Sequence, residues 1–173
     1  MIQSDIKKIV EDLIETFLDA GKISLDLREK GLTKEIKSDN TPVSNGDLEV
    51  NKILTKRISE LTPNIPIVSE ETPENKSRNN LENFWLVDPI DGTYDYINNL
   101  DEFTINAGLI IQKKPAAGLI YAPAKNRMFY SYGDDLSFEL ISGKPNKLDN
   151  SKNFNKDEIK FVSYSNKIKP EIN

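Results

Sequence analysis

Two aspartates close the aromatic-led apolar run at the middle of this chain. The run Trp85-Leu86-Val87 leads into Asp88, Asp91 stands three residues later, and Gly92 and Thr93 follow directly. An isolated buried carboxylate is costly, so an aspartate at the end of a buried strand must be solvated, capped or paired. Two close carboxylates repel each other, and a divalent cation relieves that repulsion. The spacing therefore predicts a site for hard divalent cations.

The residues around these aspartates could add the other parts of a phosphatase site. The carbonyl group of Ile90 is a neutral oxygen ligand, and Glu70-Glu71 closes a second apolar run upstream. Gly92 frees backbone N–H groups that can bind a phosphate. Two metal ions about 3.5–4 Å apart can activate a water molecule and stabilise the leaving oxygen in a phosphoryl transfer. The pattern favours a metal-dependent phosphatase.

Each of these residues also has a plain structural interpretation. Asp91-Gly92 is a common turn and Asp88-Pro89 a common strand exit, while a solvated acidic loop would explain Glu70. Thr93 can be a helix N-cap, and Asp47 can be the carboxylate of a capping box near a helix dipole. Asp47 as a general base is compatible with that second interpretation. Local spacing alone leaves both interpretations open.

The polar loop before residue 44 holds two further charged residues. Lys37 is expected to be a solvated lysine rather than a phosphate ligand. Asp39 is expected to be a turn residue.

The composition limits the chemistry. The 173 residues include no cysteine and no histidine, which excludes disulfides, Cys or His nucleophiles, imidazole bases and ordinary zinc sites. Carboxylates, hydroxyls and carbonyls remain, and these are the ligands of Mg²⁺. The net charge of −5 and the lack of a basic cluster argue against DNA or RNA as a partner.

The ends and the hydropathy of the chain favour a cytoplasmic protein. The first ten residues carry Asp5, Lys7 and Lys8 and lack the apolar region of a signal peptide. No apolar run approaches the length of a membrane span.

The elements that must position these residues predict an α+β layered fold. Helical periodicity covers residues 2–28, with Gly31 as a stop, and Ser44 opens a second helix that ends at Thr62. Strands are expected at 65–69, 84–87, 104–112, 118–121, 128–132, 136–141 and 159–164, with a short helix or turn at 93–99. Residues 33–43 and 142–157 are expected to be loops. We expect two helices packed on an antiparallel sheet, with the acidic site at strand ends.

Asp88-Pro89-Ile90-Asp91-Gly92-Thr93 resembles the signature of the inositol monophosphatase superfamily of Mg²⁺-dependent, lithium-sensitive phosphatases. Glu70-Glu71 and Asp47 are similar to its other N-terminal elements, in the same order, and the resemblance spans nearly the whole chain. Three further segments resemble the 3'(2'),5'-bisphosphate nucleotidase branch, namely Ser38–Asp47, Pro66–Glu71 and Glu102–Asn106.

The resemblance implies a layered inositol-monophosphatase-like fold, Mg²⁺ as the cofactor and a small nucleotide bisphosphate as the substrate. These enzymes remove the 3'-phosphate of adenosine 3',5'-bisphosphate, a by-product of sulfate assimilation. Asp47 and Thr93, with Glu70, would position and deprotonate the attacking water. The implied metal ligands are Glu70, Asp88, the carbonyl of Ile90, and Asp91. The implied substrate contacts are Glu70, Ile90, Asp91, Gly92 and Thr93. An inositol or sugar monophosphatase of the same superfamily is the alternative.

This sequence departs from the family pattern in three places. Tyr94-Asp95-Tyr96 stands where the nucleotidases usually have K-E-F, and Asn45-Gly46 stands where small apolar residues or Thr-Gly are usual. The family also continues into a C-terminal α/β half, whose W-D-x-x-A element completes the metal site. This sequence has no second tryptophan and no such aspartate. We therefore expect an N-terminal domain at 1–157 and the start of a truncated C-terminal half at 158–173.

Two hypotheses about the whole chain stay open in addition to that of an active enzyme. It could be an inactive chain, or a split-gene subunit that works with a separate C-terminal half. A homodimer is the other arrangement left open.

Overall fold

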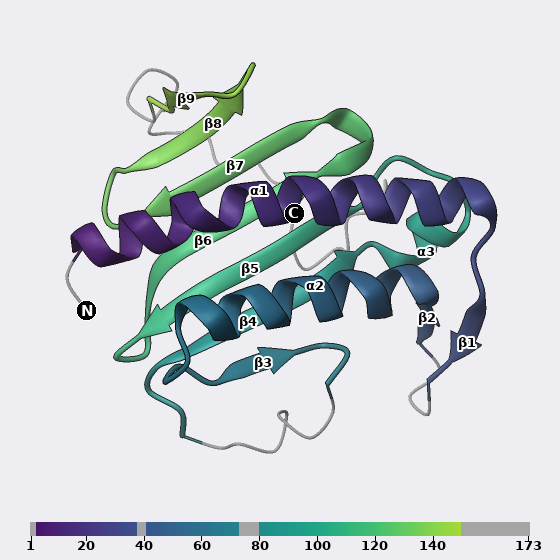
Figure 1. Ribbon diagram of the computed structural model, residues 1–173, viewed down its shortest axis with the longest axis horizontal. Helices are drawn as coiled ribbons and strands as arrows, with labels where there is room; N and C mark the ends of the chain where they lie inside the picture. The colour runs from purple at the N-terminus through teal and green to yellow at the C-terminus, as the bar shows by residue number, and fades with distance from the viewer. Residues whose placement is uncertain (1–2, 38–40, 73–79, 150–173) are drawn as a thin grey trace, which may run out of the picture.

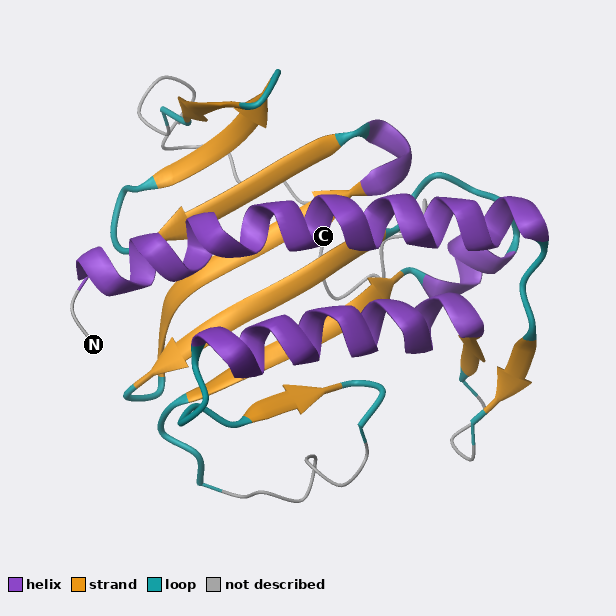
Figure 2. Ribbon diagram, in the orientation of Figure 1, coloured by secondary structure: helices purple, strands orange, loops and turns teal. Residues whose placement is uncertain are grey.

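The computed structural model describes residues 3–37, 41–72 and 80–149. Two long helices, α1 (Gln3–Lys30) and α2 (Asn45–Leu61), lie side by side across one face of a seven-stranded sheet (Figures 1 and 2). The expected α+β layering, with both helices on the sheet, is confirmed. Within the described ranges, no helix is long and apolar enough to cross a membrane.

The strands of the large sheet follow one another in sequence order. They are β3 (Ile67–Ser69), β4 (Phe84–Asp91), β5 (Thr104–Ile111), β6 (Lys114–Ala122), β7 (Arg127–Tyr132), β8 (Ser137–Ile141) and β9 (Lys144–Lys147). The smaller elements are β1 (Lys34–Ile36) and β2 (Pro42–Ser44), which form a two-stranded sheet, the short helix α3 (Thr93–Ile97) and the 3-10 turn η2 (Pro123–Lys125).

The first helix forms because apolar residues recur on one face. The side chains of that face are all buried, at Ile6, Val10, Leu13, Phe17 and Ala20. The backbone of α1 comes so close to the sheet at Gly21 that a Cβ there would lie 2.2 Å from the ring of Tyr121. Lys30 ends α1, and Gly31 follows with φ +95°, a conformation that favours glycine.

The inner face of the sheet completes the core. Trp85 and Val87 on β4 are buried, and the strands beyond add Ile105, Leu109, Leu119 and Met128 in the alternating pattern of a sheet with one packed face. The indole N–H of Trp85 donates to the hydroxyl of Thr62 at 3.0 Å. Because Thr62 is the C-cap of α2, this bond fixes the end of the helix to β4.

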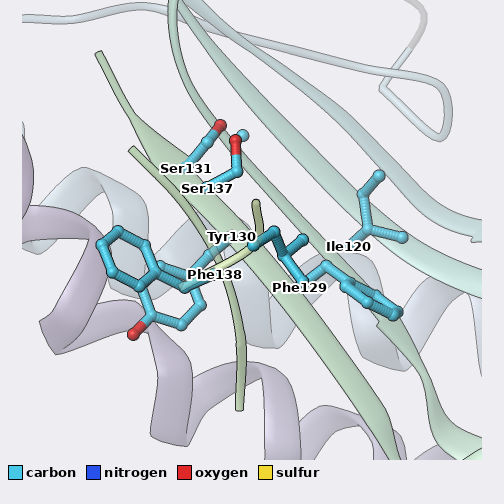
Figure 3. A pocket seen from close by; sticks show the side chains of 8 residues that line it. Ile120, Phe129, Tyr130, Ser131, Ser137 and Phe138 are labelled. Atoms are coloured by element: carbon cyan, nitrogen blue, oxygen red, sulfur yellow. The ribbon is translucent and has the colours of Figure 1, made fainter. Parts of the chain in front are cut away.

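The opposite face of the sheet is left open by the described elements. Leu86 and Ile120 lie there with 53% and 48% of their surfaces exposed. A hollow of about 190 Å³ lies over β6, β7 and β8. Ile120 and Phe129 lie on one side of these strands, whereas Tyr130 and Phe138 point to the side of the helices (Figure 3). The residues that the structure places around this hollow include none of the acidic residues of the proposed site.

The structure corrects four expectations. The sheet is not wholly antiparallel, because β3 pairs parallel with β4; a parallel pair needs a long crossover, and the segment from Glu70 to Asn83 supplies it. Strand β4 continues through Asp91 instead of ending at Val87.

The other two corrections concern expected loops. Residues 33–43 contain β1 and β2. Strand β9 lies within the expected loop 142–157, joined to β8 by Ser142-Gly143, both with positive φ. That two-residue turn is a hairpin signal. The expected domain boundary near 157 and the strand at 159–164 lie outside the described residues.

Candidate functional site

The predicted acidic residues lie where α2 and α3 begin and where β3 and β4 end (Figure 1). Strands β3 and β4 run parallel, and Ser69 pairs with Val87. Glu70 and Asp88 therefore follow at the same end of this strand pair. The backbone N–H of Glu70 donates to the carbonyl of Val87 at 3.1 Å. The strand pairing that the sequence did not predict is therefore what brings the two acidic segments together.

A hydroxyl stands between an aspartate and a carbonyl at the start of α3. The Oγ1 atom of Thr93 lies 3.0 Å from Oδ1 of Asp47 and 3.0 Å from the carbonyl oxygen of Ile90. One hydroxyl proton can be donated to only one of these acceptors at a time. The N-cap of α3 is Gly92 rather than Thr93. The capping interpretation of Thr93 is therefore wrong, and its hydroxyl joins α3 to α2.

The position of Thr93 depends on the glycine before it. Gly92 has φ +91°, in the left-handed region. A Cβ on Gly92 would lie 2.8 Å from the carbonyl oxygen of Glu102 and 3.3 Å from Cα of Phe103. Both the backbone conformation and the available space thus call for glycine at this turn.

Asp47 occupies the capping position that its sequence context predicted, and its other carboxylate oxygen contacts Thr93. Its Oδ2 accepts from the backbone N–H of Ser44 at 2.8 Å and from the Ser44 hydroxyl at 2.5 Å, which completes a capping box. Its Oδ1 is then directed at Thr93. With only 1% of Asp47 exposed, the carboxylate is held by donors from two elements.

Asp88 lies near other carboxylates and has too few hydrogen-bond donors around it. Among the described residues, its buried Oδ1 has no hydrogen-bond partner, and neither has the buried Oδ1 of Asn106 across the strand pair. Burial, followed by the carboxylates of Glu70 and Asp91, raises the pKa of Asp88 to about 7. Asp91 is exposed, and its Oδ2 accepts from Nδ2 of Asn106 at 3.3 Å.

A lysine supplies the positive charge next to this cluster. The Nζ atom of Lys37 lies 2.6 Å from Oε1 of Glu71 and 3.3 Å from Oε1 of Glu70. The Lys37 side chain is 20% exposed, so the expectation of a solvated lysine is wrong. Burial raises the pKa of Glu71, and the hydrogen bond from Lys37 opposes that rise. Asp39 lies outside the described residues.

The residues present fit a hard cation but do not form a complete cage. In the part of the chain that the structure describes, no three acidic side chains are arranged as a full metal-ligand set. The unpaired buried oxygen of Asp88 is nevertheless a position where a cation would satisfy an unmet acceptor. The neighbouring carboxylates of Glu70 and Asp91 offer oxygen ligands, which suit Mg²⁺ and similar ions. These oxygen atoms could therefore form part of a site for a hard cation.

Two contributors were missed from the sequence. The sequence pointed to Asn106 only as the end of the segment Glu102–Asn106, because its partner Asp91 comes from a different strand. The ion pairs of Lys37 gave no local signal, because the two glutamates that hold it lie more than thirty positions along the chain.

Three comparisons place the chain among known proteins. Residues 5–162 match the model of the Inositol monophosphatase family. The chain is 35% identical over 140 residues to the 3'(2'),5'-bisphosphate nucleotidase CysQ of Haemophilus influenzae, which covers 79% of this chain and 52% of that protein. It is 33% identical over 145 residues to CysQ of Buchnera aphidicola, covering 82% and 55%. The chain thus spans about half the length of the curated relatives it matches.

Solved structures agree on the fold. The extragenic suppressor protein SuhB from Bartonella henselae matches with a TM-score of 0.67 at 22% identity, over 76% of this chain and 52% of that one. An IMPase/NADP phosphatase complexed with Mg²⁺ and phosphate matches with a TM-score of 0.67 at 19% identity, over 78% and 51%. The expected fold class is confirmed.

Proposed function

The chain belongs to the inositol monophosphatase family, and on that basis we propose that its acidic site is part of a metal-dependent phosphomonoesterase centre. The reaction is the hydrolysis of adenosine 3',5'-bisphosphate to AMP and phosphate. The observation that carries the proposal is the Thr93 hydroxyl, 3.0 Å from both the Asp47 carboxylate and the Ile90 carbonyl. The unpaired buried oxygen of Asp88 adds an unmet acceptor on the same strand as Ile90.

The contact between Thr93 and Asp47 supports a route for a proton. When the Thr93 hydroxyl donates to Asp47, its oxygen lone pairs face outward and can accept a hydrogen bond from a water molecule. The water would lose its proton towards Thr93 and Asp47 as it attacks the phosphorus atom. Ser44 holds the other oxygen of Asp47, so the carboxylate keeps its direction throughout.

The acidic residues would hold the cation. Glu70, Asp88, Asp91 and the carbonyl of Ile90 are the proposed ligands. Mg²⁺, when bound, would lower the pKa of its water and offset the charge of the phosphate. Glu70 would also help to position the water. The backbone N–H groups of Gly92 and Thr93 would contact the phosphate. Glu70, Ile90 and Asp91 would contribute to phosphate binding by holding the metal ion.

The choice of substrate is supported by the relatives and by the segment that begins β5. The curated relatives that the chain matches at 35% and 33% identity are named as bisphosphate nucleotidases. Glu102-Phe103-Thr104 resembles the nucleotidase branch, and Phe103 packs against Tyr96 with ring centroids 4.9 Å apart. The runner-up substrate is an inositol or sugar monophosphate, which the family description supports.

A phosphate-release assay tests the proposal. The purified chain would be incubated with Mg²⁺ and either adenosine 3',5'-bisphosphate or inositol 1-phosphate. We expect faster release from the nucleotide, loss of release with EDTA, and loss of release in Asp91→Asn. Faster release from inositol 1-phosphate would reassign the substrate. Release that EDTA does not change would overturn the metal-dependent centre.

The domain proposal needs a separate test. We propose that residues 1–157 form the α+β domain that carries this part of the centre. If the chain alone releases no phosphate, the assay would be repeated with the separately expressed C-terminal half of the Haemophilus influenzae relative. Recovery would identify the chain as a subunit, and no recovery would reject the nucleotidase assignment.

A further inference from the structure

The turn that carries Glu70 follows a strand with little support of its own. Strand β3 has three residues and lies at the edge of the sheet, paired with β4 alone. Beyond it, the N–H of Thr72 donates to the carbonyl of Ser69 at 3.3 Å, and the N–H of Glu71 donates to the Ser69 hydroxyl at 3.3 Å. The backbone position of Glu70 is therefore set by this turn, Ser69–Thr72, while Lys37 contacts its carboxylate.

One amide side chain spans both ends of the turn. Oδ1 of Asn51 accepts from the Ser69 hydroxyl at 2.6 Å, and Nδ2 of Asn51 donates to Oγ1 of Thr72 at 3.4 Å. The orientation of the amide follows from the network. Because the Ser69 oxygen already accepts from the N–H of Glu71, its own proton is directed at an acceptor. Ser69 is buried, so this bond is shielded from water.

Asn51 also links the turn to the other side of the site. It stands four residues after Asp47 on α2, and residues at this spacing lie on the same face of a helix. Asp47 contacts Thr93 from that face, and Asn51 contacts the turn that carries Glu70. A single helix thus contacts the start of α3 through Asp47 and the turn that carries Glu70 through Asn51.

We propose that Asn51 is a positioning residue for Glu70, which fixes the Ser69–Thr72 turn and thereby sets the cation affinity of the acidic site. The inference rests on the proposed role of Glu70 as a metal ligand. A ligand held in place before binding loses less freedom when the cation arrives. Removing an outer group that orients a ligand typically lowers metal affinity by about 10–100-fold.

The experiment measures cation binding and the turn separately. Mg²⁺ would be titrated calorimetrically into the full chain, as wild type, Asn51→Ala, Ser69→Ala and the double variant. We expect each single variant to weaken binding about tenfold. The double variant should weaken it by less than the product of the two single effects, because both changes remove the bond between Ser69 and Asn51. Lys52→Ala is the matched control, since Lys52 lies next on the same helix, with its side chain 75% exposed.

Thermal unfolding in EDTA shows whether a variant still folds, and amide hydrogen exchange reports on the turn itself. We expect the N–H groups of Glu71 and Thr72 to exchange faster in Asn51→Ala than in the control. Unchanged affinity in Asn51→Ala, or additive losses in the double variant, would overturn the proposal. If the wild type binds no Mg²⁺, the proposed metal site fails. Amide hydrogen exchange then decides whether Asn51 fixes the turn. Unchanged exchange of the Glu71 and Thr72 N–H groups in Asn51→Ala would reject this role too.

Discussion

Asp88 is a carboxyl group that the fold surrounds with other carboxyl groups, and its proton affinity reflects this. Its pKa of about 7 in the folded chain lies above the ordinary value of 3.8. The folded chain therefore holds this proton more tightly than the unfolded chain does. In the absence of metal, the contribution of Asp88 to stability is fully present below pH 4 and is lost as the pH rises towards 7.

The first prediction concerns Asp88→Asn. Between pH 4 and pH 8 in EDTA, we expect the wild type to lose melting temperature relative to the variant, which carries no charge at this position. At pH 8 the variant should melt about 2–6 °C higher. This corresponds to roughly 1–2 kcal/mol in a chain of this size, a figure reduced for solvent screening because Asp88 is partly exposed. Thermal melts followed by circular dichroism would measure the difference. A variant that melts lower than the wild type at pH 8 would show that Asp88 is not strained by its neighbours.

The second prediction concerns Thr93→Val, which removes the hydroxyl and keeps the shape. The proposed proton route passes through this hydroxyl, so we expect the rate of phosphate release to fall about 10²–10⁴-fold. The affinity for Mg²⁺ should stay within about twofold, because the side chain is not a proposed ligand. Rate and calorimetric titration would be compared with Thr55→Val, whose hydroxyl bonds to α2 itself. An unchanged rate would remove Thr93 from the mechanism.

The local residues of the site could be predicted from the sequence, but their partners could not. Asp47 was expected in a capping box because Ser44 stands three positions before it, and the box is present. The acceptor role of Asp47 towards Thr93 joins residues 46 positions apart. No local pattern encodes such a contact. The ion pair of Lys37 with Glu71 went unpredicted for the same reason.

At the scale of elements, two of the departures from the nucleotidase pattern, at Gly46 and Tyr96, lie in contact with each other. A Cβ added at Gly46 on α2 would lie 2.3 Å from the hydroxyl oxygen of Tyr96 on α3. That hydroxyl donates to the carbonyl of Ser24 on α1 at 2.6 Å. Burial, followed by the charge of Asp47, raises the pKa of Tyr96, so the hydroxyl stays a donor. Three helices are thus joined at one point behind Asp47.

The third prediction is a double-mutant cycle at this point. Gly46→Ala should cost about 1–3 kcal/mol, because its methyl group overlaps the hydroxyl. Tyr96→Phe should cost about 0.5–1.5 kcal/mol, because the bond to Ser24 is lost. In the double variant the overlap with the hydroxyl is gone, but a Cβ at residue 46 would still lie 2.6 and 2.8 Å from the ring atoms Cε1 and Cζ. The combined cost should therefore be only about 0.5–1 kcal/mol below the sum.

Urea denaturation would measure all the free energies of unfolding in the cycle. Gly118→Ala serves as the matched control for adding a methyl group, since a Cβ there meets nothing closer than 3.5 Å. Combined with Tyr96→Phe, it should give additive costs. Additive costs at Gly46 as well would mean that the helix start simply shifts to make room.

Elements with strong periodicity were predictable, and elements defined by pairing were not. The helices α1 and α2 and strands β5 to β8 follow from apolar spacing and turn signals, because each pattern is contained in its own segment. The parallel direction of β3 depends on how the chain returns after Glu71, and β9 exists because β8 offers it a partner. Neither the direction of β3 nor the presence of β9 can be predicted from the residues of that strand alone.

At the scale of the whole molecule, the sheet is packed on one face and open on the other in the described part of the chain. The curated relatives are about twice as long, and the site lacks a complete ligand set. A sheet of this kind can be stable with one covered face, provided that the helices bury enough apolar area. The apolar residues of the open face would then contribute little to folding.

The fourth prediction tests that statement with the double variant Leu86→Lys, Ile120→Lys. Because both side chains are about half exposed, we expect a change in the free energy of unfolding within about 0.5 kcal/mol per substitution. The fluorescence of a bound apolar dye should fall, since the face loses apolar area. Val87→Lys, which places a charge on the packed face of the same sheet, is the contrasting control and should not fold. A large loss of stability in the double variant would show that the face is packed in solution.

The contact between Gly46 and Tyr96 also constrains how such a sequence can arise by single changes. Starting from alanine and phenylalanine at these positions, the ring atoms Cε1 and Cζ already crowd the methyl group, and gaining the hydroxyl first would add a further overlap. Losing the methyl group first leaves only a small gap, which the hydroxyl can later fill. An evolutionary path therefore has a preferred order, with glycine before tyrosine. The reverse path is open only if phenylalanine returns before alanine does. The packing at this contact thus constrains the order in which the two substitutions can be acquired during evolution.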